Sequence, residues 1–523
     1  MNEVARAGRR EWIGLGVLAL ACLLYSMDLT VLHLAVPSLS ATLAPSSTQL
    51  LWIIDIYGFL VAGSLIIMGT LGDRIGRRRL LMIGAGSFGL ISVVAAFSTS
   101  AEMLIASRAV MGVAGATLAP STLSLLFNMF PDPKQRSVAI GVWIAGFSAG
   151  GAIGPVIGGF LLEHFWWGSV FLLSLPVMGL LLVVGPRVLP EYRAPEPGRL
   201  DITSATLSLF AILALIFTLK ESTQGEFGPL VITSALIGIA LSYVFVRRQR
   251  RLADPLIDLK LFRLPAFSAA LGINVAGIFM MVGTFLFVAQ YLQLVIGLSP
   301  LEAGMWSLPH AAAFIVGSTT APKYVYRFRP ALVLGVTLSV VAVGLAVLAA
   351  APVEGGLGMV VLSSVIAALG LAPALSLTTE LVVGSAPPEK AGLASGISET
   401  GAELGGSLGI AILGSIGTAL YRSRVIDNLP AGVSSEAAET LGGAVTVAAS
   451  LPAETAALLL EAAKGGFVDG MRLAAGVSAV VALLAAGTAA LVLRRVQPAA
   501  PVEHGAHASG DHPGPEPSGV AAS

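Results

Sequence analysis

The sequence has little charge and almost no cysteine. Only 11% of its 523 residues are charged, against roughly 25% in an ordinary soluble domain. Its single cysteine, Cys22, excludes an internal disulfide and a cysteine-based metal site. Basic and acidic residues number 30 each, so no positive field indicates binding to a nucleic acid. These shortages argue against a soluble protein and against a nucleic-acid partner.

Motifs for nucleotide hydrolysis and for zinc chemistry are missing as well. The phosphate loop GxxxxGKS/T does not occur, and neither does HExxH. No soluble stretch is long enough to house a cofactor, and no convincing nucleophile or metal cluster supports an enzyme. We therefore expect no enzymatic activity, no cofactor and no bound metal. Any uphill movement of a substrate must then draw on an ion gradient.

Long apolar runs are what the sequence has in abundance. Hydrophobic residues make up 55% of the chain. A transmembrane helix needs about 20 mostly apolar residues, and this rule predicts an all-α integral membrane protein with fourteen spans. The predicted spans are 12–35, 51–71, 80–97, 103–126, 138–162, 167–184, 202–219, 230–245, 267–295, 303–321, 331–351, 357–383, 391–420 and 468–493.

Basic residues are divided unevenly between the two sides that these spans define. Four Lys and Arg side chains fall in connections from odd-numbered to even-numbered spans and a fifth, Arg472, lies just inside the outer end of the last span, whereas 24 fall in the termini and the other connections. Because cytoplasmic loops carry the excess of positive charge, both termini are predicted to be cytoplasmic. The connection 421–467 is then extracellular, and its segment 452–466 is predicted to be a short amphipathic helix with a Gly stop. The tail 498–523 is predicted to be disordered.

The connection between the second and third spans carries an ordered motif, GTLGDRIGRRR, at 69–79. Gly69 permits close helix packing, and Gly76 allows a tight turn. Asp73 can pair with nearby arginines or with the positive end of a helix dipole. Ordinary positive-inside charge explains the arginines but not the order of Gly, Asp and Gly. The last three arginines are expected at the cytoplasmic surface: Arg77, Arg78 and Arg79.

This motif resembles the loop signature of the major facilitator superfamily, Gly-x-x-x-Asp-Arg-x-Gly-Arg-Arg. The matching residues are Gly69, Asp73, Arg74, Gly76, Arg77 and Arg78. The fourth span contains RAVMGVAGA, which is similar to the membrane arginine motif through Arg108 and Gly112. The fifth span contains GGAIGPVIGG, which resembles the antiporter motif of the same superfamily. Its matching residues are Gly150, Gly154, Pro155, Gly158 and Gly159.

With fourteen spans, the chain is similar to the fourteen-helix drug:proton antiporters, above all to bacterial efflux pumps for quaternary ammonium compounds, ethidium and fluoroquinolones. The resemblance implies six-helix bundles at 1–186 and 264–497, with two extra helices and cytoplasmic linkers at 187–263. It also implies a central site reached alternately from each side of the membrane. In the second half, the equivalent of the loop signature at 317–329 lacks the aspartate, which implies an asymmetric cytoplasmic gate.

Asp28 is the most unusual residue in the apolar runs. With a rise of about 1.5 Å per residue, it lies about 24 Å above the cytoplasmic end of its span, and Asp55 and Arg108 lie at a similar depth. Two carboxylates around Arg108 would offset the cost of burying a guanidinium. Ionisable residues at this depth indicate a functional site, so we interpret all three as proton-coupling or substrate-binding groups. The alternative is a fixed ion pair that only holds helices together.

Glu399 and Glu403 form a second acidic pair, on one face of the thirteenth span. Both cannot ionise cheaply in a low dielectric, so the pair suits a proton carrier that a cationic substrate displaces. His310 is interpreted as a hydrogen-bonded structural histidine or as a proton relay. Glu380, near the cytoplasmic end of its span, is expected to reach water. Aromatic residues that could offer ring faces to a lipophilic cation are Tyr25, Trp52, Tyr57, Trp143, Phe147 and Tyr291.

We interpret the chain as a proton-driven exporter of amphipathic, mostly cationic compounds in a bacterial cytoplasmic membrane. We expect a monomer whose partners are its substrates, protons and the lipid bilayer. Two alternatives stay open, the export of an endogenous metabolite or lipid and a non-transporting membrane sensor. The sensor does not account for the antiporter glycines or the acidic pairs.

Overall fold

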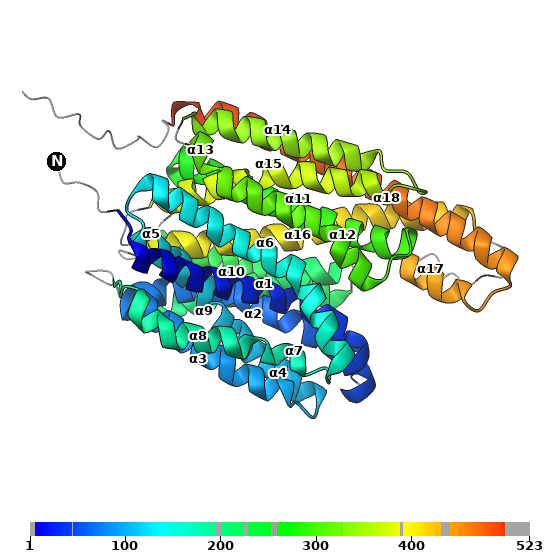
Figure 1. Ribbon diagram of the computed structural model, residues 1–523, viewed down its shortest axis with the longest axis horizontal. Helices are drawn as coiled ribbons and strands as arrows, with labels where there is room; N and C mark the ends of the chain where they lie inside the picture. The colour runs from blue at the N-terminus through cyan, green and yellow to red at the C-terminus, as the bar shows by residue number, and fades with distance from the viewer. Residues whose placement is uncertain are drawn as a thin grey trace, which may run out of the picture.

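The computed structural model describes residues 6–496 except 44, 46, 194–200, 223–227, 253–254, 256, 258, 326, 387–390, 430–432 and 434–439. The tail at 498–523, predicted to be disordered, therefore lies outside the described residues. Within the described part the regular elements are helices, and the long ones lie side by side along one direction (Figure 1). The prediction of an all-α protein is confirmed.

The first half of the chain contains six long apolar segments built from eight helices. The fourth segment contains two helices in succession, α4 and α5, and the sixth contains α7 and α8. The helices are α1 (Arg9–Leu43), α2 (Ser47–Ile75), α3 (Arg77–Ala96), α4 (Ala101–Gly115), α5 (Leu118–Met129), α6 (Pro133–His164), α7 (Ser169–Leu172) and α8 (Ser174–Val188).

Two helices follow in the middle of the chain, and the rest belong to the second half. Proline starts α10, α11, α12 and α14, where its missing N–H costs no helical hydrogen bond. The elements are α9 (Ile202–Ser222), α10 (Pro229–Gln249), η1 (Leu261–Arg263), α11 (Pro265–Gln290), η2 (Tyr291–Val295), α12 (Pro300–Thr320), α13 (Pro322–Val325), α14 (Pro330–Ala349), α15 (Leu357–Gly384), α16 (Ala391–Asp427), α17 (Leu441–Ala448), α18 (Ala453–Val492) and η5 (Leu493–Arg495).

Each of the fourteen predicted spans coincides with helical structure. Among the described residues, 12 helical segments are long and apolar enough to cross a membrane. The two remaining predicted spans, 202–219 and 303–321, are helical as well and correspond to α9 and α12. The apolar part of α9 is the shorter segment Thr203–Thr218.

Helix contacts divide the long helices into two groups that meet along two seams. In the first group α1 packs along α6 and α2 along α4, and in the second α11 packs along α16 and α14 along α15 and α18. The seams are formed by α2 with α16 and by α6 with α12. Helix α9 contacts both α2 and α16, so the α9–α10 pair lies against the first seam. An ion pair of 3.0 Å between Asp201 and Arg248 links the ends of that pair.

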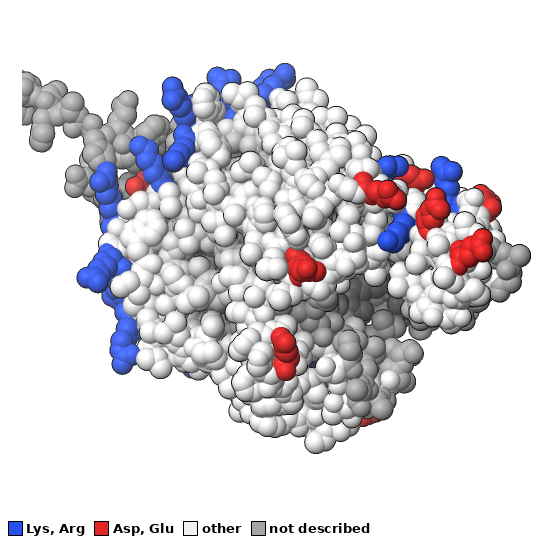
Figure 2. Space-filling view, turned by 45° about the vertical axis from the view of Figure 1, so that its right-hand side comes forward, with Lys and Arg blue, Asp and Glu red and all other residues white. Residues whose placement is uncertain are grey.

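Charged side chains gather at the two ends of the molecule. Figure 2 shows Lys and Arg along the end where the N-terminus lies, a mostly white middle whose few charged side chains are acidic, and a mixture of both signs around the opposite end. An uncharged belt between polar ends is what a bilayer requires, because burying a charge in hydrocarbon is costly. The more basic end matches the side predicted to be cytoplasmic.

The connection predicted as a separate extracellular element at 421–467 is organised differently. Helix α16 continues to Asp427, and α18 begins at Ala453 and runs without a break for 40 residues. The predicted Gly stop is therefore wrong. A Cβ at Gly466 would lie 3.4 Å from the Tyr421 carbonyl oxygen, so glycine serves close packing against α16 rather than helix termination. The start of α18 and α17 together project from the bundle (Figure 1).

Candidate functional site

Arg108 on α4 is held inside the first half by three kinds of partner. One terminal nitrogen donates to Asp28 Oδ2 at 2.8 Å, and Nε donates to the Ile53 carbonyl oxygen at 3.3 Å. The guanidinium carbon lies 4.6 Å from the centre of the Tyr57 ring, within cation–π range. The Arg108 side chain is only 2% exposed, so the carboxylate neutralises a charge that water barely reaches. The predicted pairing of Asp28 with Arg108 is present.

The close approach of α4 to α2 depends on Gly112. A Cβ there would lie 2.6 Å from the Tyr57 carbonyl oxygen, closer than real Cβ atoms come. Glycine thus lets the Arg108 side chain reach the polar atoms of α2. Asp55 belongs to α2, but its side chain lies outside the described residues. The predicted approach of this second carboxylate to Arg108 therefore stays a prediction.

The second acidic pair lies on α16 and faces α1. The Tyr25 hydroxyl of α1 donates a hydrogen bond of 3.0 Å to Glu403 Oε1. Glu399 lies within electrostatic range of Cys22 and Tyr25, two residues of α1 that are nearly one turn apart. Both carboxylates of the second half are thus directed at the helix that carries Asp28.

An aromatic cluster connects the two charged groups. Tyr25 lies 6.2 Å from Tyr57 and 5.8 Å from Phe147, and Phe147 lies 4.8 Å from Trp143, measured between ring centres. Asp28, Arg108 and Glu403 all lie within electrostatic range of the buried Tyr57 hydroxyl. That hydroxyl has no hydrogen-bond partner among the described residues. Four of the six aromatic residues predicted to contact a cation therefore form one cluster beside the acidic groups.

The other two predicted aromatic residues lie elsewhere. Trp52 stacks on Phe217 of α9, with ring centres 6.4 Å apart. The Tyr291 ring is fully buried, and its hydroxyl donates to the Pro352 carbonyl oxygen at 2.7 Å. Tyr291 therefore holds the start of the α14–α15 connection. Neither ring joins the cluster, because a position on a helix does not reveal which neighbour the side chain meets.

The antiporter glycines form the contact between α6 and α1. A Cβ at Gly158 would lie 2.7 Å from Val31, and one at Gly150 would overlap the Leu23 carbonyl. Gly146, which the sequence reasoning did not include, lies one turn earlier and faces Ala19 in the same way. The recurrence of glycine every four residues along α6 was the sequence signal that could have identified Gly146. Gly154 is buried, Gly159 faces open space, and the Pro155 side chain lies outside the described residues.

The loop signature connects three elements near the basic end. Gly76 has a φ of 109°, which favours glycine, and it begins the turn into α3. Asp73 forms an ion pair with Arg77 and also accepts a hydrogen bond from the Leu393 backbone N–H at the start of α16. Arg77 is completely buried, so its expected surface position is wrong. Burial follows because Asp73 supplies the countercharge four residues earlier on the chain.

A short segment after α8 also packs on the signature, and the sequence reasoning missed it. Arg78 donates to the Leu189 carbonyl oxygen at 3.0 Å, and its backbone N–H donates to Glu191 Oε1 at 3.1 Å. The Arg77 N–H donates to the Tyr192 carbonyl oxygen at 2.9 Å. The charged pair in EYR, directly after the sixth span, was the signal that could have found this contact.

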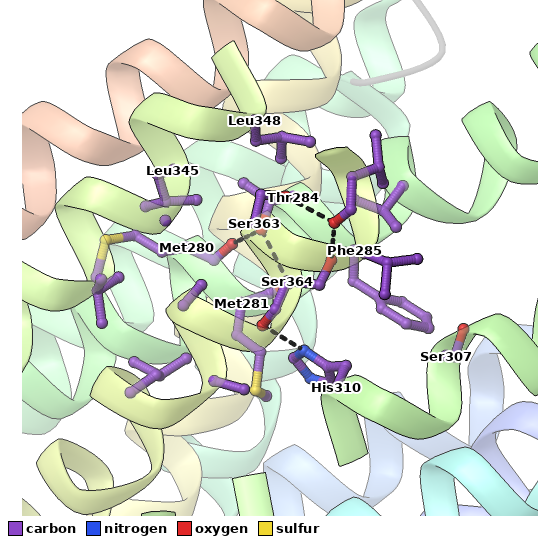
Figure 3. A pocket seen from close by; sticks show the side chains of 18 of the residues that line it. Met280, Met281, Thr284, Phe285, Ser307, His310, Leu345, Leu348, Ser363 and Ser364 are labelled. Carbon is purple, nitrogen blue, oxygen red and sulfur yellow. Dashed lines mark hydrogen bonds between the residues drawn. The ribbon is translucent and has the colours of Figure 1, made fainter. Parts of the chain in front are cut away.

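His310 and Glu380 complete the predicted ionisable residues. His310 lies in a separate cavity of the second half, where its Nδ1 is 3.1 Å from the Ser364 carbonyl oxygen (Figure 3). Glu380 is only 8% exposed, so the expectation that it reaches water is wrong. Within the described part of the chain, no group of three or more His, Cys, Asp or Glu residues could hold a metal ion.

The sequence of this chain is similar to those of known proteins. The model of the Major Facilitator Superfamily matches residues 18–410, which include both charged groups and the loop signature. The chain belongs to the major facilitator superfamily. It is a multi-pass membrane transporter and not an enzyme.

Several relatives in the superfamily cover nearly the whole chain. The multidrug efflux pump LfrA of Mycolicibacterium smegmatis is 42% identical over 94% of this chain and 98% of its own length. The methyl viologen resistance protein SmvA of Salmonella typhimurium is 38% identical over 92% of this chain and 97% of its own. The tetracenomycin C resistance and export protein of Streptomyces glaucescens is 35% identical over 94% and 93%.

Two solved transporter structures support the fold. The human organic anion transporter MFSD10 superposes with a TM-score of 0.61 at 15% identity, over 92% of this chain and 99% of the other. A bacterial homolog of the human lysosomal transporter Spinster gives 0.55 at 18% identity, over 93% and 98%. At these identities the likeness concerns the fold alone.

Proposed function

We propose that this superfamily member is a proton-coupled multidrug efflux antiporter that exports lipophilic cations by alternating access. The observation that carries the proposal is the hydrogen bond from Tyr25 to Glu403. It joins the helix that bears Asp28 to the helix that bears both glutamates. A cation that reaches the aromatic cluster therefore meets carboxylates from both halves of the molecule.

The chemistry of these groups suits an exchange of a proton for a cation. Glu399 and Glu403 lie four residues apart on one helical face, and two adjacent carboxylates in an apolar setting favour a shared proton. A positive substrate between the rings and the glutamates replaces that proton as countercharge. Asp28 alternates between Arg108, a proton and the substrate as the cavity changes sides. Release of the proton then accompanies capture of the cation.

The same proposal includes the domain bounds, the membrane orientation, the oligomeric state and the substrate classes. The two six-helix units are 1–186 and 264–497, with 187–263 inserted between them. Both termini lie in the cytoplasm of a bacterium, the membrane is the cytoplasmic one, and the transporter acts as a monomer. Its substrates include quaternary ammonium compounds, dyes and fluoroquinolones. Support comes from the basic end of the molecule (Figure 2) and from two relatives, a multidrug efflux pump and a methyl viologen resistance protein.

The test is transport by the purified chain in proteoliposomes. With an imposed pH gradient, ethidium and methyl viologen should accumulate against their own gradients, and a protonophore should abolish accumulation. Export in cells should likewise stop with a protonophore while ATP is held constant. Continued export under that treatment, with the sodium gradient also removed, would contradict ion coupling. A panel with neutral metabolites and lipids separates drug export from the alternative of an endogenous substrate.

A further inference from the structure

A cavity of about 70 Å³ lies among α11, α12, α14 and α15, in the second half of the molecule (Figure 3). None of the residues that line it belongs to the cation site proposed above. Its wall is mostly apolar and includes thioethers and aliphatic chains. The lining residues that matter below are His310, Thr284, Ser307, Ser363, Ser364, Phe285 and Trp306.

Four hydroxyl groups line the cavity, and each has already used its only proton. Every one of them donates to a backbone carbonyl oxygen three or four residues earlier in its own helix. The donor–acceptor distances are 2.6 Å for Thr284, 2.9 Å for Ser307, 2.7 Å for Ser363 and 2.9 Å for Ser364. A hydroxyl in this state offers only oxygen lone pairs to a ligand.

His310 has the same bias toward accepting. Its Nδ1 bonds to the Ser364 carbonyl oxygen, as Figure 3 shows, and a carbonyl oxygen can only accept, so Nδ1 carries the proton. In the neutral ring Nε2 is then an acceptor, and it has no partner among the described residues. None of the described residues that line the cavity is acidic, so none stabilises a charged ring. The polar groups of the cavity can therefore only accept hydrogen bonds, so a ligand must supply the O–H or N–H donor.

The same absence of acidic side chains from the lining disfavours a cationic ligand, because a buried charge without a countercharge is costly. The volume is below the roughly 150 Å³ of a cavity that holds benzene, so only the polar end of a ligand fits inside. Phe285 and Trp306 are 48% and 44% exposed, and their rings offer an apolar surface to the remainder of the molecule.

We propose that this cavity is a second ligand site, which binds an uncharged lipophilic molecule through an O–H or N–H donor. The donor bonds to Nε2 of His310, and the apolar body lies against Phe285 and Trp306. The site differs in ligand class from the acidic cluster, where cations meet carboxylates. It stands whether or not the proposed export of cations is correct.

Binding of three naphthalene probes tests the proposal on the full chain in lipid nanodiscs, by scintillation proximity with tritiated 2-naphthol. The probes are 2-naphthol, 2-methoxynaphthalene without the donor, and the cation 2-naphthyltrimethylammonium. We expect saturable 2-naphthol binding that is at least fivefold tighter than that of 2-methoxynaphthalene, the effect of about one hydrogen bond. The cation should not compete for the same site.

Variants of the protein then show where 2-naphthol binds. His310→Phe keeps an aromatic ring but removes the acceptor, so 2-naphthol affinity should fall about fivefold while 2-methoxynaphthalene affinity stays unchanged. Leu308→Ala is the matched control, on the same helix, 44% exposed and outside the lining. Asp28→Asn should bind 2-naphthol normally, which separates this site from the cation site. Equal affinity of the two neutral probes, or an unchanged affinity in His310→Phe, overturns the proposal.

Discussion

Tyr25 of α1 donates a hydrogen bond of 3.0 Å to Glu403 of α16, across the boundary between the two halves of the transporter. The donor lies three residues before Asp28, which pairs with Arg108 at 2.8 Å. The acceptor lies four residues after Glu399. One contact thus joins the helix that carries Asp28 to the helix that carries Glu399 and Glu403.

Removal of this contact should slow the transport cycle. A hydrogen bond to a charged group contributes about 1.5–3 kcal/mol, so Tyr25→Phe should weaken the state in which α1 and α16 touch by at least tenfold. We expect the rate of ethidium export by purified Tyr25→Phe in proteoliposomes to fall at least fivefold. Tyr243→Phe is the control, because Tyr243 is 65% exposed on α10. Unchanged export in Tyr25→Phe would make the contact incidental.

Asp28→Asn should abolish coupled export. Asn is nearly isosteric and still accepts a hydrogen bond from Arg108, but it cannot ionise. The variant should fold and reach the membrane, while accumulation of ethidium against its gradient falls at least tenfold in proteoliposomes. A normally expressed Asp28→Asn that still concentrates ethidium would falsify the coupling role. Asp28 would then be a structural partner of Arg108, and Glu403 would become the leading candidate.

Glu399→Gln and Glu403→Gln should impair export selectively. A divalent cation needs a partner for each charge, so methyl viologen export should fall at least fivefold more than ethidium export in either variant. Initial rates of both substrates in the same vesicles measure the ratio. A control is Glu102→Gln, on an exposed carboxylate at the start of α4 that accepts a hydrogen bond from Gln49. Equal losses for the two cations would remove the glutamates from substrate selection.

Asp73→Asn should affect conformational cycling rather than binding. Asp73 neutralises the buried Arg77 and accepts from the Leu393 N–H, so it holds α2 to the start of α16. Its loss should lower the maximal rate of transport about tenfold and change the ethidium Kd by less than twofold. Stopped-flow transport and equilibrium fluorescence give the two quantities. Loss of binding with a normal rate would contradict this assignment.

The orientation can be tested with reporters. A cytoplasmic reporter at the C-terminus should be active, because 24 of the 30 Lys and Arg residues fall on the predicted inner side. A reporter inserted near Gly432, between α16 and α17, should report the exterior. The reverse pattern would overturn the predicted orientation and the odd-to-even assignment of the connections.

Much of the fold could be read from the sequence because the bilayer imposes a simple rule. Apolar runs of about 20 residues must become helices in hydrocarbon, since every backbone polar group needs an internal partner. The positive charges of the loops then predict which side of the membrane each loop faces. The rule gives no account of helix ends outside the apolar region, which is why the Gly stop before 467 was wrong: α18 begins at Ala453, next to the predicted start, but runs on through both glycines.

The sequence indicated the candidate residues and the pairing of Asp28 with Arg108, but not their other contacts. Asp28, Arg108, Glu399 and Glu403 stood out because ionisable groups inside apolar runs are expensive. Nothing local could show that Tyr25 bonds to Glu403, 378 residues away, or that Arg77 is buried by Asp73 while Arg78 meets the segment after α8.

The sequence by itself determined the class of protein, the helical spans and the identity of the charged residues, because these depend on composition and on local spacing along one helix. Only the tertiary structure decided which of those residues meet. Helix rotation and the pairing of α1 with α6 and of α2 with α16 follow from glycine contacts between distant segments. They placed Tyr25, Tyr57, Trp143 and Phe147 in one cluster and set Trp52, Tyr291 and His310 apart from it.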